Sequence, residues 1–309
     1  MLHARRTAGD WVGRPWLSAW SPTLVREEMN YWLLRPDARL RPAVRCYFVV
    51  EAGARLACKQ ELHLPDGYAE VVFNLGASFD RSALGETTSC RAMKSSYVIG
   101  ARSHSVLTRD LGNVKVIGVK LEPRMLHHLI RTPLAELRDS TVTLRDLNDR
   151  ALLTLESMLA DCASVEDIVG ALDGFFLRQQ SRSAPHEPVI EQCVERIRDT
   201  HGAMSLAAWT RERCIDPRTL QRKFAARIGM TPKTYARIVR FKHAYHRLIT
   251  QCASVARADD YLDGYYDQSH FYKEFRYFTG TSPLALIAAR TPASTAVTDH
   301  LLTGDLSAA

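Results

Sequence analysis

The feature that most constrains the fold is an internal repeat in the last third of the chain. The first copy is Asp216-Pro-Arg-Thr-Leu-Gln-Arg-Lys-Phe224 and then Gly229-Met-Thr-Pro232. The second is Asp267-Gln-Ser-His-Phe-Tyr-Lys-Glu-Phe275 and then Gly280-Thr-Ser-Pro283. Five positions, an aspartate, an apolar residue, a phenylalanine, a glycine and a proline, recur at one offset of 51 residues. Recurrence at a fixed offset indicates that one structural unit is present twice.

The repeated residues are those that begin, anchor and end a helix. Asp216 and Asp267 are good N-caps, because a carboxylate accepts hydrogen bonds from the first free N–H groups of a helix. The two apolar residues of each copy lie four apart and form one face to bury, while Gly229 and Gly280 suit a C-cap with positive φ. The Thr-Pro and Ser-Pro pairs are start signals for a further helix. Each copy is therefore predicted to be a short helix between two others, buried on one face only.

The exposed faces of the two predicted helices carry side chains that can bind DNA: Arg218, Thr219, Gln221, Arg222 and Lys223 in the first copy, and Gln268, Ser269, His270, Tyr272 and Lys273 in the second. Arg can read guanine and Gln adenine through paired hydrogen bonds, although an ordinary solvated helix face is polar too. The charge favours DNA. From residue 211 to 247 eleven basic residues oppose two acidic ones, a net charge of +9 in a chain whose total is +7. Phosphate binding requires such a concentration, so double-stranded DNA is the predicted partner.

Residues 190–290 resemble the DNA-binding domain of the AraC/XylS family of transcription regulators. Pro217 to Phe224 matches the family's first recognition helix, and Gly264-Tyr-Tyr-Asp-Gln-Ser-His-Phe271 with Gly280-Thr-Ser-Pro283 matches its second. The resemblance implies two helix-turn-helix units between about Leu206 and Ile287, joined by a long helix at about 232–250. The recognition helices would enter adjacent major-groove segments about 34 Å apart. In this pattern the base-reading residues of the first unit are Arg218, Gln221 and Arg222, and those facing DNA in the second are Gln268, Ser269, Tyr272 and Lys273.

The second unit departs from the family pattern. Asp259 and Asp260 stand where the family has a small apolar pair, and buried carboxylates are costly, so this helix is expected to be shifted in register. From residue 254 to 278 three basic residues face five acidic ones, a net charge of −2. We therefore expect the first unit to supply most of the affinity and the second mainly register and specificity. Arg222→Ala should then weaken operator binding more than Lys273→Ala.

The chain before residue 180 is predicted to be β-rich first and helical afterwards. Short apolar runs separated by turn residues are typical of a sandwich or barrel; they lie at 44–50, 70–75, 97–100 and 114–120. Apolar residues at helical spacing follow at 125–130, 147–159 and 168–177. Leu64 to Gly76, Tyr97 to Gly100 and Val116 to Pro123 resemble a poorly characterised sensor-like domain that precedes the DNA-binding domain in some AraC-type regulators. That resemblance implies a sensing or dimerisation domain and names no ligand.

The predicted fold class is α+β. It combines an N-terminal β-rich, barrel-like (cupin-like) domain with following helices and a C-terminal all-α double helix-turn-helix domain. Small polar residues and two prolines at 181–188 mark a linker. The predicted division is an arm (1–29), a sensor or dimerisation domain (30–180), the linker (181–188), the AraC-type DNA-binding domain (189–290) and a flexible tail (291–309).

Metal and acid–base chemistry have little support in the sequence. The seven cysteines are scattered without a Cys-x-x-Cys pair, so neither a disulfide framework nor a zinc site follows. Four histidines lack the close spacing that fixes metal ligands: His63, His104, His127 and His128. Asp66 in Pro-Asp-Gly is first a turn residue, and Glu70 is expected to face solvent at a strand start.

Three other functions are compatible with parts of the sequence. A DNA-repair alkyl-acceptor enzyme with this type of helix-turn-helix domain would need a clustered zinc–cysteine site. A cupin-like enzyme would need a set of histidine ligands in the N-terminal half. A protein-interaction adaptor that has lost DNA binding is supported only by the acidic second unit. The sequence therefore predicts a regulator and not an enzyme, with no cofactor.

The expected location is the bacterial cytoplasm, with the protein on the nucleoid when bound. Free thiols suit a reducing compartment, no export signal follows the first residues, and no run approaches the ~20 apolar residues of a membrane helix. A small-molecule effector, RNA polymerase and a second copy of the chain are candidate partners. The sequence leaves open the effector, the operator, the target genes, activation versus repression, and the oligomeric state.

Overall fold

The computed structural model describes residues 29–53, 60–84, 91–110, 112–130, 132–180, 187–250 and 264–289. The predicted tail and most of the predicted arm and linker lie outside these residues.

The N-terminal part contains two separate antiparallel sheets, in a barrel-like arrangement rather than one closed ring of the described strands. The larger has the order β1-β2-β9-β4-β7-β10 and the smaller the order β3-β8-β5-β6. The strands are β1 (Met29–Leu34), β2 (Val44–Ala52), β3 (Gln60–His63), β4 (Ala69–Asn74), β5 (Phe79–Ala83), β6 (Arg91–Met93), β7 (Tyr97–Ile99), β8 (Val106–Asp110), β9 (Val114–Leu121) and β10 (Thr141–Thr143). The four strands predicted from apolar runs are β2, β4, β7 and β9, which form the centre of the larger sheet.

Side-chain alternation along β4 separates the two faces of that sheet. Val71 and Phe73 join the main core under the helices, whereas Val72 packs between the two sheets. Gly118 of β9 lies on this inner side, where an added Cβ would be 1.9 Å from the Phe48 ring. The inner space is therefore filled by side chains from both sheets.

Helices cover the outer face of the larger sheet. Those after β9 are α1 (Pro123–Leu129), the short 3-10 helix η3 (Leu134–Leu137), α2 (Leu144–Leu147), α3 (Arg150–Ala160) and α4 (Val165–Gln180). A further 3-10 helix, η1 (Ala38–Leu40), joins β1 to β2. Leu155 of α3 and Phe176 of α4 are buried in the same core as β4. The Tyr47 hydroxyl of β2 donates a hydrogen bond to Asp173 of α4 at 2.7 Å, which ties the helices to the sheet.

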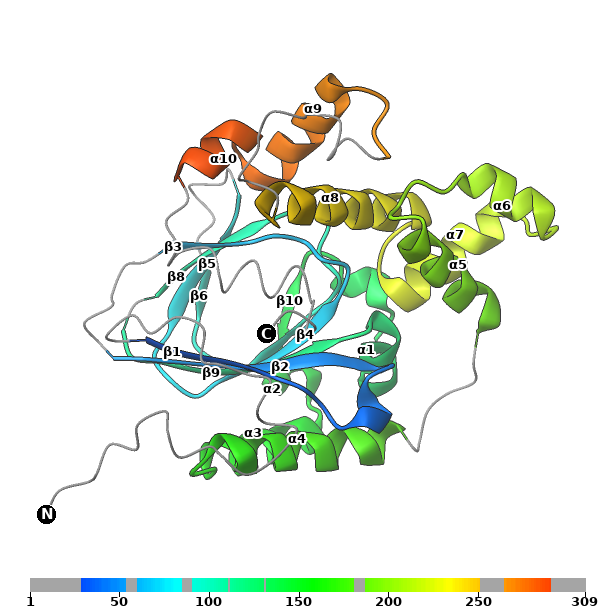
Figure 1. Ribbon diagram of the computed structural model, residues 1–309. Coiled ribbons are helices and arrows are strands. Elements are labelled where there is room, and N and C mark those ends of the chain that lie inside the picture. The colour runs from blue at the N-terminus through cyan, green and yellow to red at the C-terminus, as the bar shows by residue number, and fades with distance from the viewer. Residues whose placement is uncertain are drawn as a thin grey trace, which may run out of the picture.

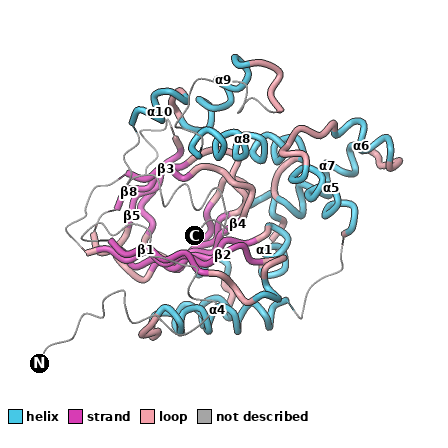
Figure 2. Tube along the Cα trace, in the orientation of Figure 1, coloured by secondary structure: helices cyan, strands magenta, loops and turns pink. Residues whose placement is uncertain are grey.

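The C-terminal part is all helical. Its elements are α5 (Pro188–Asp199), α6 (Leu206–Glu212), α7 (Pro217–Ile228), α8 (Pro232–Thr250), α9 (Gln268–Thr279) and α10 (Pro283–Ala289). Figures 1 and 2 show α8 lying over the β-rich part, with α5, α6 and α7 at one end and α9 and α10 at the other. The long linking helix predicted at about 232–250 is α8. No described helix is both long and apolar enough to span a bilayer.

The two parts of the chain share a hydrophobic core. Phe224, Phe241 and Phe275 hold the C-terminal helices together, and Leu64 and Ala101 from the N-terminal part are buried in the same cluster. The helical part is therefore docked on the β-rich part.

Candidate nucleic-acid interface

The first helix-turn-helix unit consists of α6, a turn and α7. Asp216 caps α7, because its carboxylate accepts a hydrogen bond from the Thr219 N–H at 2.7 Å. Gly229 ends the helix with φ +89°, and Cys214 in the turn has φ +53°. The caps predicted for the first copy of the repeat are confirmed.

The second unit repeats these features in α9. Asp267 accepts a hydrogen bond from the His270 N–H at 2.7 Å, and Gly280 ends the helix with φ +74°. The start of α10 is capped by Ser282, whose Oγ accepts from the Ala285 N–H at 3.2 Å. Asp259 and Asp260 lie outside the described residues, so the expected register shift of their helix stays a prediction.

Most of the predicted DNA-contacting side chains lie on the exposed faces of α7 and α9. The exposed ones are Arg218, Gln221, Arg222, Lys223, Gln268, Ser269, His270 and Lys273. Thr219 and Tyr272 are half-buried, and the Tyr272 ring packs edge-on against Phe271. We call these ten residues the reading face. Their contact with DNA stays a prediction.

A buried carboxylate that the sequence interpretation missed fixes α9 against α8. Glu274 is only 4% exposed. It accepts from Arg237 Nε at 2.7 Å and from Arg240 Nη2 at 3.5 Å, both on α8. Its place in the buried stripe with Phe271, Phe275 and Phe278 was visible in the sequence, because residues three and four apart share a helix face.

Carboxylates neutralise part of the basic charge of residues 211–247. Lys223 and Arg227 form ion pairs with Glu187, at 3.6 and 3.1 Å. Arg237 and Arg240 bind Glu274. Glu274 in turn adds no negative charge to the DNA side of the second unit. The contrast between the two units is therefore smaller than the net charges of +9 and −2 suggest.

Asp66 and Glu70 are buried, which corrects the expectation that Glu70 faces solvent. Glu70 and Lys120 are paired across β4 and β9, and alternation places both on the inner face. Arg102 donates to Glu70 at 3.0 Å, and Lys120 donates to Asp66. Burial alone raises the pKa of Asp66, but the Lys120 ammonium holds it below its ordinary value. These charges form a buried network under α8.

Of the four histidines considered in the sequence, only His127 and His128 lie next to each other, and His63 and His104 have other partners. His63 Nε2 is 2.8 Å from Thr108 Oγ1, and burial lowers the pKa of His63 to about 3. His104 Nδ1 lies 3.1 Å from Asp139, while the rings of His127 and His128 are 6.2 Å apart. Within the described ranges no group of three or more His, Cys, Asp or Glu residues is placed to hold a metal ion.

The helical part is attached to the β-rich part by Arg198 of α5. Its guanidinium donates to both oxygens of Glu122, at 3.0 and 2.8 Å, and to the Tyr235 hydroxyl at 2.8 Å. It also lies over the Tyr68 ring, 5.5 Å from the centroid. Lys242 of α8 is 5.1 Å from the same ring, and burial lowers the pKa of this lysine to about 8.

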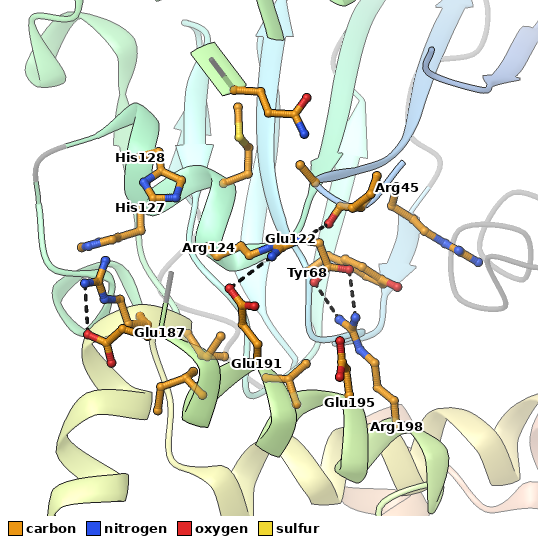
Figure 3. A pocket seen from close by; sticks show the side chains of 18 of the residues that line it. Arg45, Tyr68, Glu122, Arg124, His127, His128, Glu187, Glu191, Glu195 and Arg198 are labelled. Carbon is orange, nitrogen blue, oxygen red and sulfur yellow. Dashed lines mark hydrogen bonds and ion pairs between the residues drawn. The ribbon is translucent and has the colours of Figure 1, made fainter. Parts of the chain in front are cut away.

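A cavity of about 580 Å³ lies beside this attachment. Figure 3 shows His127 and His128 at one end and Arg198 with Glu122 at the other, with the Arg124–Glu191 ion pair between them. Because α5 supplies one wall and the β-rich part the other, the cavity lies between the two parts.

Comparison with known families identifies both parts of the chain. Residues 209–289 match a helix-turn-helix domain family, and residues 33–143 match a domain of unknown function, DUF6597. The chain therefore has an AraC-type helix-turn-helix domain at its C-terminal end, preceded by a DUF6597 domain. A helix-turn-helix domain of this kind supports DNA-binding transcription regulation. No curated protein matches the chain in sequence.

Solved structures give only distant likenesses. ToxT from Vibrio cholerae is 11% identical, with a TM-score of 0.41 over 75% of this chain and 98% of ToxT. An unsaturated fatty acid-bound ToxT is 14% identical, with a TM-score of 0.39 over 86% of this chain and 98% of ToxT. KdgF from Halomonas sp. is 11% identical, with a TM-score of 0.25 over 34% and 89%. What these proteins bind says nothing about the ligand of this chain.

Proposed function

We propose that the protein is a sequence-specific transcription regulator that reads double-stranded DNA with α7 and α9. The observation that carries this proposal is the pair of short helices with the same caps, offset by 51 residues, and each with an exposed polar face. A helix-turn-helix protein places its second helix in the major groove. α7 follows α6 in that position, and α9 corresponds to α7 through the repeat.

The residues proposed to read bases are Arg218, Gln221 and Arg222 on α7. Their side chains are exposed, and each can donate or exchange paired hydrogen bonds with a base edge. Gln268, Ser269, Tyr272 and Lys273 are proposed to face DNA from α9. Lys223 is proposed to contact phosphate, because its side chain is exposed at the flank of α7.

We also propose that the N-terminal part controls DNA binding in response to a small molecule or a partner. It would do so through the two helix-turn-helix units, which we call the reading heads. The support is the extent of the docking, which includes a shared core and the Arg198–Glu122 pair. The interdomain cavity has a volume within the range of about 300–1,000 Å³ that holds small molecules in other proteins. A ligand that contacts both walls would change the free energy of docking by its differential affinity for the docked state.

Selection from random duplexes tests the DNA-reading proposal. Full-length protein is incubated with a library of random double-stranded DNA, and bound sequences are recovered over several rounds. A two-part motif with its halves one helical turn apart is expected. Recovery of no enriched sequence, with binding that responds little to salt, would overturn the regulator and favour an adaptor.

A further inference from the structure

A groove lies in the helical part, where α8 and α9 meet the segment that begins α6. Its volume is about 780 Å³, and its walls come from the segment that begins α6, from α8 and from α9. It is therefore formed by both units and the helix that joins them.

The groove is strongly basic. Its charged side chains are Lys233, Arg237, Arg240, Lys273 and Glu274, a net charge of +3. Glu274 is buried and bound to the two arginines, so it holds them in place rather than exposing a carboxylate. Lys233 at the start of α8 is exposed. The chemistry of the groove suits an extended anion.

The groove opens on the side of the molecule predicted to meet DNA. His270 and Lys273 line it and also belong to the reading face. On α9 these two residues and Tyr277 lie three and four apart, so they form one stripe beside α8. Tyr277 is 52% exposed, and its ring lies 5.2 Å from the Arg237 guanidinium. The groove and the reading face are therefore continuous.

The geometry points to the sugar-phosphate backbone of the operator as the occupant of this groove. Two recognition helices in adjacent major-groove segments leave one stretch of backbone between them. That stretch passes the part of the protein that joins the heads, and α8, which joins them, supplies one wall of this groove. Its phosphates would meet Lys233 from α8 and Lys273 from α9, and the contact at Lys233 carries no sequence information. This inference rests on the proposed DNA-reading function and assigns a residue outside the reading face.

The test measures the dependence of affinity on salt. Binding of full-length protein to the selected duplex and to a random duplex of equal length is titrated over a series of KCl concentrations. Removing one phosphate contact lowers the slope of log K against log[salt] by about 0.9. Lys233→Gln is expected to lower the slope by that amount on both duplexes, and Lys233→Glu to lower it further. Lys233→Arg, which keeps the charge, should keep the wild-type slope.

Lys94→Gln is the matched control, because Lys94 is exposed in the N-terminal part and the substitution removes the same charge. Its slope should equal that of the wild type. The groove proposal is overturned if Lys233→Gln keeps the wild-type slope, if its loss is confined to the selected duplex, or if Lys233→Arg loses the slope as well. A wild-type protein that binds both duplexes equally, with an unchanged slope for Lys233→Gln, would overturn both proposals. If the protein still prefers the selected duplex but Lys233→Gln has the wild-type slope, only the groove proposal is overturned.

Discussion

At the scale of single residues, the contributions of the two reading heads to DNA affinity can be compared by substituting Arg222 in the first and Lys273 in the second. Both are exposed, but an arginine can bind a guanine edge through two bonds, whereas a lysine acts as a point charge. Arg222→Ala is expected to cost about 1–3 kcal/mol of specific binding, and Lys273→Ala less. Titrations of the selected duplex at one salt concentration measure both losses.

Arg150→Ala serves as the control for that comparison, because Arg150 is an exposed arginine of α3 remote from the helical part. Its affinity should equal that of the wild type. Equal losses for Arg222→Ala and Lys273→Ala would refute the asymmetry between the heads. Because Glu274 is buried, the difference between the two losses of affinity should be smaller than the net charges alone predict.

Residue identities predicted caps well and long-range ion pairs poorly. Asp216 and Gly229 act on neighbours within four residues, so their roles follow from local spacing. Glu70 meets Lys120 and Arg102, which are 50 and 32 positions away in the chain. No local pattern contains that pairing, and the inward direction of Glu70 depends on which face of β4 the helices cover.

At the scale of elements, the strands found from the sequence are those covered on both faces. β2, β9, β4 and β7 are the inner strands of the larger sheet, and all six residues of β4 are buried. Burial on both faces gives a continuous apolar run, which sequence analysis detects. The strands it missed are β1 and β10, at the edges of this sheet, and the whole smaller sheet. β10 and the strands of the smaller sheet are short or carry charges such as Asp80 and Arg81, and β1 is buried only at alternate positions, so these strands lack that signal.

The contact between α8 and α9 depends on Glu274. Glu274→Ala would leave Arg237 and Arg240 without their shared carboxylate, and breaking a buried pair in this way costs on the order of 3 kcal/mol. Hydrogen exchange is expected to show faster exchange in α9 while α7 keeps its protection. The footprint on the selected duplex should shrink to the half bound by the first unit.

Glu274→Gln is the control, because the amide keeps the shape and can still accept a hydrogen bond. It should lie between the wild type and Glu274→Ala in both measurements. If α9 keeps full protection in Glu274→Ala, the second head is held by its phenylalanines alone and the ion pairs do not position it.

At the scale of the whole molecule, the N-terminal part touches both heads. At the end of α7, Gly229 lies against the Leu134 carbonyl, where an added Cβ would be 3.0 Å from the oxygen. At the end of α9, Ser105 donates to the Phe278 carbonyl, and Gly280 packs against Leu84. The sequence predicted the two parts but not this docking, because the contacts join loop ends that no periodic pattern marks.

Because both heads contact the N-terminal part, we expect the distance between them to depend on docking. A substitution of Glu122 tests this. Glu122→Ala removes the bidentate partner of Arg198 but leaves the Arg198–Tyr235 bond inside the helical part. Undocked heads would bind the full operator with a flexible spacing, so affinity for the full site should fall. Affinity for a duplex in which the second half-site is scrambled should stay at the wild-type value.

Glu136→Ala, at an exposed glutamate of η3, controls for the loss of one carboxylate. Equal losses on full and half sites would mean that docking does not set the separation of the heads, and that α8 alone positions them.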